Sequence, residues 1–318
     1  MFFKNNSYQL NKFVFYIFLF LIGFNLKAQE NLVPNGSFEI LSDCPFDAIS
    51  LNKAIGWFSP SNSTPDIYNI CSDLSFNNSV PLNGLGYQYA KEGNGYVGIV
   101  PYGQGTDYRE YISCKLSKQL AANKIYEAAY YVNLATSSPI ASSQFGFGFS
   151  GDSVHFNTNS LIQANSILVS DTLVLDSTNW IKISFFFESQ GNENYIIIGN
   201  FSSDLNTKID TLNIISGKDC YYYLDLVTLT ELDFNYENCL TPNGDGVNEI
   251  AFKNVNVSND FKVNIFNRWG EKINTINMKD GWDGTDFNKN LLSDGVYFYQ
   301  IIFKDKKSFK NGFIHLIR

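Results

Sequence analysis

A segment rich in tyrosine and amide side chains, residues 83–111, carries the residue types in this chain best suited to binding chemistry. Its sequence is NGLGYQYAKEGNGYVGIVPYGQGTDYREY, which holds six tyrosines among asparagine, glutamine and arginine. Aromatic rings stack on the apolar faces of sugars, while amide, carboxylate and guanidinium groups hydrogen-bond to hydroxyl groups. The candidate ligand-binding residues are Tyr87, Gln88, Tyr96, Tyr102, Tyr108 and Arg109.

The glycines between these tyrosines predict loops that present the rings to solvent. For any single tyrosine, however, a structural role is favoured, because alternate tyrosines in strands commonly flank a core. Tyrosines gathered at one face or edge of the fold would favour glycan binding, whereas buried or scattered ones would favour a structural or adhesin-like protein.

Catalytic chemistry has few candidates in this sequence. The chain has two histidines, His155 and His315, and no nucleophile or phosphate-binding motif, which disfavours Ser-His-Asp, Cys-His and nucleotide chemistry. A glycosidase needs only two suitably spaced carboxyl groups. Glu92, Asp107 and Glu110 lie in the tyrosine-rich segment and keep a small glycosidase open as an alternative, although the sequence favours a protein that is not an enzyme.

A second cluster of oxygen-bearing side chains lies in LTPNGDGVNEI, residues 240–250. Calcium prefers alternating oxygen ligands on a turn, and Asn243, Asp245, Asn248 and Glu249 are the candidate ligands. Only two of the four carry a charge, so a hydrogen-bonded turn of the Asx type is the favoured interpretation and Ca²⁺ the alternative. We expect no other cofactor.

The elements around these residues are strands. Residues 129–135, 144–150, 180–188, 194–201 and 221–229 have the composition and pattern of strands, and no amphipathic helix of four turns separates them. An all-β sandwich is therefore predicted. Residues 261–270, 295–303 and 312–318 predict a second, small sandwich, with Trp269 and Trp282 in its packing and residues 304–311 as a charged turn.

Processing and charge divide the chain further. Lys4 and Lys12 precede a short apolar run, residues 13–24, which is typical of a cleaved signal peptide ending near residue 28. The five cysteines fit an oxidising compartment, and Cys44 with Cys71 is the favoured disulfide. Residues 29–238 carry 22 acidic and 9 basic side chains, whereas residues 239–318 carry 9 acidic and 11 basic ones. An acidic body disfavours nucleic-acid partners.

The tail has the strongest resemblance to a known family. TPNGDGVNE, VNIFNRWGEKI, GWDGTD, LLSDGVYFYQIIF and GFIHLIR follow one another over residues 240–318. In order and spacing they resemble the gliding-motility-associated C-terminal sorting domain, the type B signal of the type IX secretion system of Bacteroidota. The resemblance implies the type IX machinery as a partner, and a protein that is secreted or displayed at the outer cell surface.

The body has a looser resemblance. NLVPNGSFE (31–39), Gly56-Trp57 and YYYLDLVTL (221–229) resemble the first and last strands of galactose-binding-like jelly rolls, the fold of many carbohydrate-binding modules. The expected organisation is a signal peptide (1–28), a jelly-roll-like sandwich (29–236) and a sorting domain (239–318). An extracellular polysaccharide or surface glycan is the expected ligand of the sandwich.

Overall fold

The structure is a computed structural model, and it describes residues 29–47, 50–73, 75, 77–105, 107–212, 219–232, 238–253, 261–302 and 308–318. The expected signal peptide, residues 1–28, lies outside the described residues, as does most of the expected boundary between body and tail. Among the described residues, no helix is long and apolar enough to cross a membrane.

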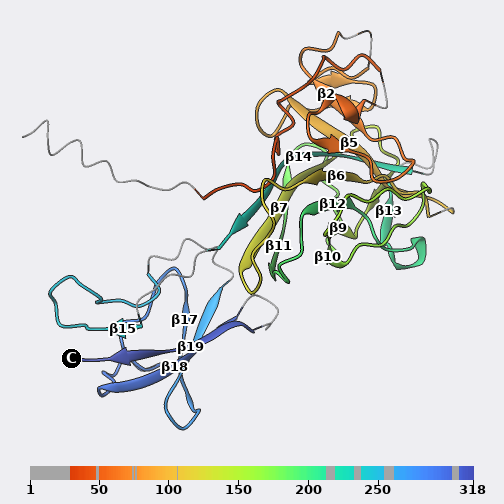
Figure 1. Ribbon diagram of the computed structural model, residues 1–318. Coiled ribbons are helices and arrows are strands. Elements are labelled where there is room, and N and C mark those ends of the chain that lie inside the picture. Colours follow the sequence, from red (N-terminus) through yellow and green to blue (C-terminus); the bar gives the residue numbers. More distant parts are fainter. Residues whose placement is uncertain are drawn as a thin grey trace, which may run out of the picture. The chain divides into compact units, whose positions relative to one another are not determined.

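The body is built from two five-stranded sheets of antiparallel strands (Figure 1). The first sheet has the order β1 (Trp57–Phe58), β6 (Ile112–Lys115), β12 (Tyr195–Gly199), β9 (Phe145–Ser150), β10 (Ser166–Ser170). The second has the order β11 (Ile181–Glu188), β7 (Ile125–Leu134), β14 (Asp219–Glu231), β5 (Gly95–Gly103), β2 (Asp66–Asn69). The prediction of an all-β sandwich is confirmed, and each of the five body strands expected from the sequence is present.

Shorter elements decorate the two sheets. β8 (Ile140–Ser142) pairs with β13 (Ile209–Thr211), and β3 (Leu82–Asn83) pairs with β4 (Gly86–Tyr87). Single 3-10 turns lie at Leu51–Lys53 and Asp204–Asn206.

Aromatic side chains from both sheets meet in the core between them. Phe149 of β9 lies 4.6 Å from Phe187 of β11, and Phe145 lies 4.9 Å from Tyr222 of β14, measured between ring centroids. Strand β9 reads FGFGFS because its phenylalanines face this core while its glycines face outward. A Cβ on Gly146 would stand only 2.5 Å from the ring of Phe201, which covers that outer surface. Glycine is therefore required there by close packing.

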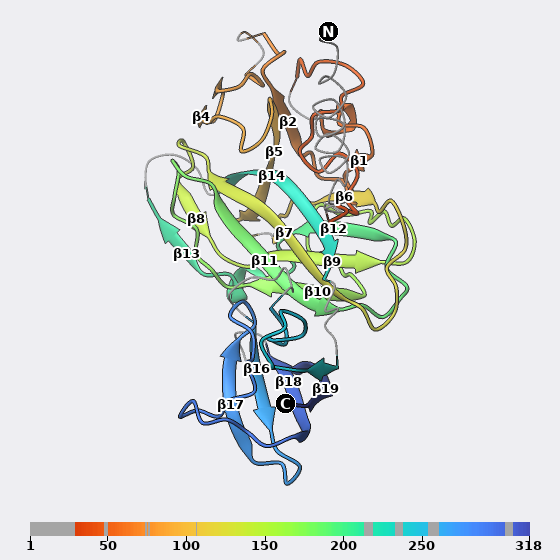
Figure 2. The same cartoon turned by 90° about the vertical axis from the view of Figure 1, so that its left-hand side faces the viewer.

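The outer face of the second sheet is also aromatic. Tyr96 of β5 lies 5.3 Å from Tyr68 of β2 and 4.8 Å from Tyr223 of β14, and all three side chains are buried. The segment that covers them includes the hairpin β3–β4, which Figure 2 shows beside β5. The second sheet is thus packed on both faces in this region.

The tail forms one further sheet, here called the tail sheet, with the order β15 (Cys239–Leu240), β19 (Ser308–Leu316), β18 (Gly295–Ile302), β16 (Lys262–Phe266), β17 (Lys272–Asn277). Its three expected strands are confirmed. β19 begins at Ser308, inside the segment expected to be a turn, because it extends its pairing with β18 as far as Ile302.

The buried face of the tail sheet is covered by loop residues. Among the described residues, no second regular sheet packs against it. Phe252, Met278 and Trp282 are almost fully buried against it, and Trp282 bonds back to Ala251 through a short bridge. The expectation that Trp269 packs likewise is wrong, since its side chain is 80% exposed. Trp269 lies within a tight turn at residues 267–270, which holds it away from the core.

Candidate functional site

Most of the candidate ligand-binding residues lie in the interior of the body. Tyr87 is 53% exposed and Tyr108 is half-buried. The other four have exposed fractions between 0% and 8%: Gln88, Tyr96, Tyr102 and Arg109. A buried side chain offers no surface to an extracellular ligand, so the expectation that loops present all these groups is corrected.

Strand β5 explains the burial of two of the tyrosines. The glycines of GYVGIVPYG favour a loop, yet this segment forms one nine-residue strand. Tyr96 lies under the covering hairpin, whereas Tyr102 joins the core between the sheets. Position 98 of this strand is occupied by glycine because a Cβ there would clash with the hydroxyl of Tyr221. Glycine therefore marks a close approach here and not a turn.

Arg109 is a structural cation that links a loop to the 3-10 turn at Asp204–Asn206. Its Nη2 lies 2.9 Å from Oδ1 of Asp204 and donates to the carbonyl oxygen of Ser202 at 2.8 Å. Its Nη1 donates to the carbonyl oxygen of Tyr108, and the guanidinium lies over the ring of Tyr102 at 5.3 Å. Because all of these partners belong to the protein itself, the guanidinium group of Arg109 is already engaged and is not presented to a ligand.

Glu110 is buried and fully engaged. It accepts hydrogen bonds from the hydroxyl of Tyr108 at 2.9 Å, the backbone N–H of Val100 at 2.9 Å and the N–H of Thr64 at 3.3 Å. Burial raises the pKa of Glu110 to about 7, although these hydrogen bonds act in the opposite direction.

The other two candidate carboxylates lie in different surroundings. Glu92 is exposed and accepts a hydrogen bond from Oγ of Ser37 at 2.9 Å. Asp107 accepts from the backbone N–H of Asp204 at 2.6 Å. The three carboxyl groups thus have separate partners, and this arrangement gives a two-carboxylate mechanism no support.

The exposed aromatic surface of the body lies on the covering hairpin. Tyr87 and Tyr89 are 53% and 62% exposed, their ring centroids are 5.6 Å apart at 90°, and the hydroxyl of Tyr87 donates to that of Tyr89 at 3.1 Å. Trp180 donates from Nε1 to the carbonyl oxygen of Tyr89 at 3.0 Å and lies half-buried beside the pair. We call Tyr87, Tyr89 and Trp180 the tyrosine corner-site.

Tyr89 is the residue that the sequence-based candidate set omitted. Tyr87, Gln88 and Tyr89 alternate, and in an extended backbone alternate side chains point the same way. The burial of Gln88, which donates to the carbonyl oxygen of Thr178 at 3.4 Å, turns both tyrosines toward solvent. That alternation was visible in the sequence.

The base of the hairpin is fixed by one asparagine. Asn83 accepts a hydrogen bond from the hydroxyl of Tyr223 at 2.8 Å and donates to the hydroxyl of Tyr96 at 2.9 Å. Tyr96 in turn donates to the carbonyl oxygen of Gln88 at 3.1 Å. The buried tyrosines therefore position the exposed ones.

Two carboxylates hold the chain that follows the hairpin. Oδ2 of Asp225 accepts hydrogen bonds from the N–H groups of residues 91 and 92 at 2.7 and 3.0 Å. Oε1 of Glu39 accepts from those of residues 94 and 95 at 2.7 and 2.9 Å. Burial raises the pKa of Asp225 to about 7.

Charged side chains border this surface on the second sheet. Nζ of Lys91 lies 4.6 Å from the ring centroid of Tyr131. Lys182, opposite Tyr131 in the register, forms an ion pair with Glu127 at 2.6 Å. Lys91 follows Tyr89 by two residues and Lys182 follows Trp180 by two, so both cations lie close in sequence to the tyrosine corner-site.

In the loop at residues 243–249, side-chain oxygens accept hydrogen bonds from the loop's own backbone. Asn243 and Asp245 each accept from the N–H two residues later, at 3.0 and 2.8 Å, and Glu249 accepts from Gly244 and Gly246 at 2.6 and 3.2 Å. Asn248 takes a positive φ of 52°. These are Asx-type turns, the interpretation favoured from the sequence, and calcium stays a prediction at Asn243, Asp245, Asn248 and Glu249.

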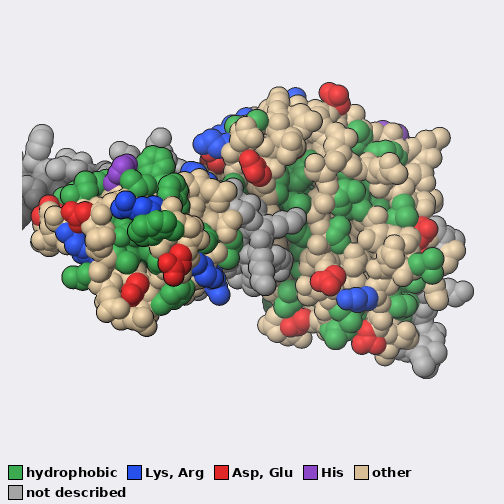
Figure 3. Space-filling view, turned by 90° about the horizontal axis from the view of Figure 1, so that it is seen from below, with side chains coloured by type: hydrophobic (Ala, Val, Ile, Leu, Met, Phe, Trp, Pro, Cys, Tyr) green, Lys and Arg blue, Asp and Glu red, His purple; other side chains and the backbone are tan. Residues whose placement is uncertain are grey.

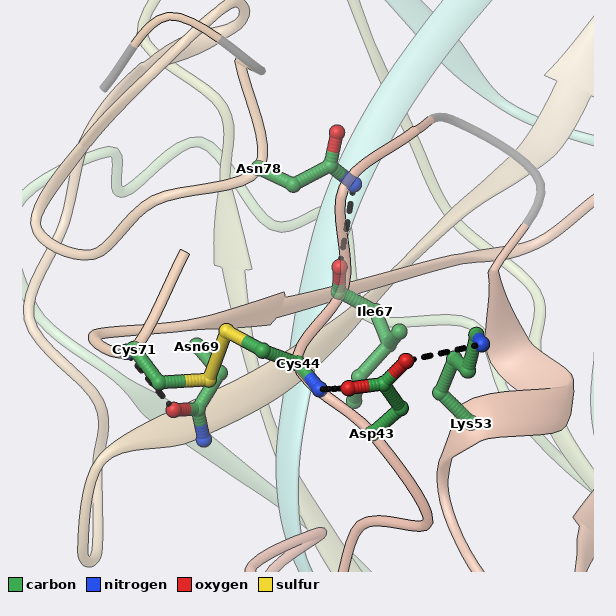
Figure 4. Close-up of a disulfide and its surroundings, with 7 residues drawn as sticks. All are labelled: Asp43, Cys44, Lys53, Ile67, Asn69, Cys71 and Asn78. Carbon is green, nitrogen blue, oxygen red and sulfur yellow. Dashed lines mark hydrogen bonds and ion pairs between the residues drawn. A yellow bond between two sulfur atoms is a disulfide. The ribbon is translucent and has the colours of Figure 1, made fainter. Parts of the chain in front are cut away.

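Cys44 and Cys71, the pair favoured from the sequence, form a disulfide with a Cα–Cα distance of 5.9 Å (Figure 4). Asp43 accepts the N–H of Cys44 and pairs with Lys53, while Asn69 accepts the N–H of Cys71. The bond ties an irregular N-terminal segment to the end of the edge strand β2. Cys114, Cys220 and Cys239 are free thiols.

Comparison with protein families decides the nature of the tail. Residues 234–316 match the family described as the CHU_C type IX secretion signal domain. Residues 234–316 are a type IX secretion signal domain. The chain is thus directed to type IX export, which places it at the cell surface or outside the cell. The matched segment begins at residue 234, a few residues before the expected start at 239.

The body shows only distant likeness to solved structures. A CBM22-1 xylan-binding domain from Paenibacillus barcinonensis Xyn10C has 14% identity and a TM-score of 0.34, covering 64% of this chain and 96% of its own. A cyclase from Fischerella sp. TAU has 13% identity and a TM-score of 0.39, covering 64% and 98%. TmCBM61, solved in complex with β-1,4-galactotriose, has 12% identity and a TM-score of 0.30, covering 64% and 99%. Such values transfer no ligand to this chain. No curated protein matches it.

Proposed function

We propose that this chain is a type IX-exported protein whose β-sandwich body binds an extracellular glycan through the tyrosine corner-site. The observation that carries the proposal is the exposed pair Tyr87 and Tyr89, whose rings stand at right angles 5.6 Å apart. Two such rings form an apolar corner edged by hydroxyl groups, which suits one sugar ring lying against one tyrosine face.

The rigidity of the hairpin supports a binding role. Its base is held by hydrogen bonds between Asn83 and two buried tyrosines, and its exit is held by Asp225. A ligand that meets a fixed surface loses less free energy to the ordering of side chains and loops. Two exposed rings on a rigid hairpin therefore need few further contacts to give measurable affinity.

The net charge of the body limits the class of glycan that it can bind. Residues 29–238 carry a net charge of −13 from 22 acidic and 9 basic side chains, so an anionic polysaccharide would be repelled at low salt. On the face shown in Figure 3, acidic and basic side chains lie dispersed among polar and hydrophobic ones. We therefore expect a neutral polysaccharide.

The rival function is a structural or adhesin-like role without a small-molecule site. The observation in its favour is the burial of Tyr96, Tyr102 and Tyr111, which serve the core and not a ligand. The two functions predict different results when the exposed tyrosines are removed. In a glycan-binding body, ligand binding is lost although the fold remains intact, whereas a structural body has no ligand binding to lose.

The test is binding of the full mature chain to a glycan array and to insoluble neutral polysaccharides. The Tyr87→Ala/Tyr89→Ala variant should lose at least about tenfold in affinity, since exposed aromatic anchors dominate such contacts. Phe46→Ala is the matched control, because Phe46 is also an exposed body aromatic, 47% accessible, on a different loop. Runs with calcium and with EDTA separate this site from the loop at residues 243–249.

The outcomes separate the two functions. Saturable binding that disappears in the tyrosine variant and persists in Phe46→Ala supports the glycan site. Binding that is equal in both variants places the ligand elsewhere. If the wild-type chain binds no glycan although a cooperative unfolding transition shows that it is folded, the structural role remains.

A further inference from the structure

Three phenylalanines form a straight row across the face of the tail sheet that points away from its core. Phe266 of β16 pairs with Phe298 of β18, and Phe298 pairs with Phe313 of β19, so their side chains lie side by side on one face. Phe298 is 46% exposed, Phe313 is 43% exposed, and Phe266 is half-buried. We call these three residues the phenylalanine row.

A row of uncharged polar side chains lies next to it. Two residues along each strand, Asn264 pairs with Gln300, and Gln300 pairs with Asn311. Asn264 also accepts a hydrogen bond from the hydroxyl of Thr275 on β17 at 2.8 Å. A hollow of about 450 Å³ is lined by the phenylalanine row together with Gln300 and Asn311. An aromatic row and an amide row thus run in parallel across three strands.

The fold does not need these aromatic side chains outside. The opposite face of the same strands supplies the core, where Val263, Ile265, Ile301 and Ile314 are at most 1% exposed. Large side chains on a solvent-facing sheet surface are a hazard for aggregation, which is normally avoided with charged residues. Phenylalanines in register across β16, β18 and β19 add to the pairing of the strands, but an apolar row on a solvent-facing sheet surface also marks an interaction site.

We propose that the phenylalanine row and its neighbouring amide row are the surface through which a protein of the type IX secretion machinery recognises this signal domain. A secretion signal is read by binding, and the match of residues 234–316 makes this domain the signal. The centres of protein interfaces are enriched in aromatic side chains and depleted of charge. The two rows satisfy both conditions, and their amides can bond to the partner's polar groups.

The composition favours a protein partner over a sugar. Phenylalanine lacks the hydroxyl or indole N–H with which tyrosine and tryptophan engage a wet ligand. The tyrosine corner-site of the body has such polar tips, and the phenylalanine row does not. The partner is accordingly a machinery protein with an apolar patch flanked by hydrogen-bonding groups.

Export from a bacterium that carries a type IX secretion system tests the proposal. The full-length chain with Phe298→Thr/Phe313→Thr should appear outside the cell at no more than about one tenth of the wild-type level and accumulate in the periplasm. Threonine keeps the β-strand preference of these positions while removing the aromatic surface. Phe298→Leu/Phe313→Leu, which keeps an apolar surface, should retain most of the export.

Phe287→Thr/Leu291→Thr is the matched control. These side chains are 57% and 72% exposed in the same domain but lie outside the two rows, so this variant should be exported normally. Folding is checked on the purified chains by thermal unfolding. If the threonine pair unfolds the domain, Asn311→Lys, an exposed substitution that places a charge in the amide row, replaces it and should lower export equally.

The contrary results are specific. Normal export of a folded Phe298→Thr/Phe313→Thr variant overturns the proposal, as does equal loss in the Phe287→Thr/Leu291→Thr control. Unchanged export with lost self-association or lost polysaccharide binding would assign the row to a second copy or to a glycan instead. Neither result would affect the glycan site proposed for the body, whose test uses purified protein.

Discussion

At the scale of single residues, Arg109 is a polar side chain whose loss should destabilise the body strongly. Its guanidinium is fully buried and lies 2.9 Å from Oδ1 of Asp204. Its loss removes the ion pair and the hydrogen bonds to the carbonyl oxygens of Tyr108 and Ser202, whereas Asp204 is 21% exposed and keeps two backbone donors, so the expected cost is about 2–4 kcal/mol. We therefore expect Arg109→Ala to lower the free energy of unfolding by that amount, measured by urea denaturation.

The matched control for Arg109 is Lys182→Ala. Lys182 pairs with Glu127 at 2.6 Å, but its side chain is 43% exposed, and surface pairs contribute about 1 kcal/mol or less. Equal stability of the two variants would show that Arg109 is not structurally important. Loss of glycan affinity in a stably folded Arg109→Ala chain would restore it as a ligand contact.

Glu110 gives the body a pH dependence of defined sign. Burial raises its pKa to about 7, above the value of about 4.3 expected when unfolded, so the folded state binds the proton more tightly. The stability from this group is complete below the unfolded pKa and is lost as pH rises toward 7. We expect Glu110→Gln to flatten the fall in unfolding free energy between pH 4.5 and 7.5 by roughly 2–4 kcal/mol.

The measurement is chemical denaturation of wild type and variant across that pH range. Glutamine keeps only part of this network, because the N–H groups of Val100 and Thr64 donate to different carboxyl oxygens and the amide nitrogen must face one of them. The variant's curve should therefore lie lower as a whole, and the prediction concerns its slope. Asp225 has a pKa raised in the same direction, so part of the slope should remain. Parallel curves for the two proteins would contradict the assignment.

At the scale of elements, the disulfide between Cys44 and Cys71 holds the edge strand β2 to the segment before it. The two cysteines are 27 residues apart, and closing a loop of this length stabilises the folded state by about 3.5 kcal/mol. Cys44→Ser/Cys71→Ser should therefore lower the free energy of unfolding by roughly 2–4 kcal/mol. Denaturation with and without reductant checks this, because reductant should affect only the wild type.

The strands buried between sheets could be predicted from the sequence because their apolar runs are long and rich in β-branched and aromatic residues. The sequence does not predict β5 because its glycines are typical of loops, whereas in the structure Gly98 is there to admit the ring of Tyr221. That tyrosine lies more than a hundred residues away in sequence, so no local pattern could show the contact. The same long-range packing decides that Tyr96 is buried while Tyr87 is exposed.

The phenylalanine row was hidden from the sequence for a related reason. Phe266, Phe298 and Phe313 occur on three separate strands, and only the register of the tail sheet places them side by side. Each strand pattern alone showed which residues alternate, but not which neighbours they meet. The prediction for Trp269 was wrong for a different reason: this residue lies in a tight turn, which leaves its side chain 80% exposed.

At the scale of the whole molecule, the two proposed sites belong to parts with separate tasks. The tyrosine corner-site lies on a body with a net charge of −13 over residues 29–238, whereas residues 239–318 have a net charge of +2. One site carries tyrosine hydroxyls suited to a hydrated ligand, and the other carries phenylalanines suited to a protein. Export and ligand binding should therefore be separable by mutation.

Transfer of the signal domain to an unrelated cargo tests this separation. A soluble reporter with a Sec signal peptide at its N-terminus and residues 233–318 at its C-terminus should be exported by a type IX-competent bacterium, because residues 234–316 make up the signal domain. The chain ending at residue 232 should stay in the periplasm yet bind the same glycan as the full chain, since the corner-site and its supports lie before that residue. Fractionation of cells followed by a polysaccharide pull-down measures both properties. Retention of the reporter inside the cell would mean that the body also contributes to recognition, and the phenylalanine row would then be only part of the export signal.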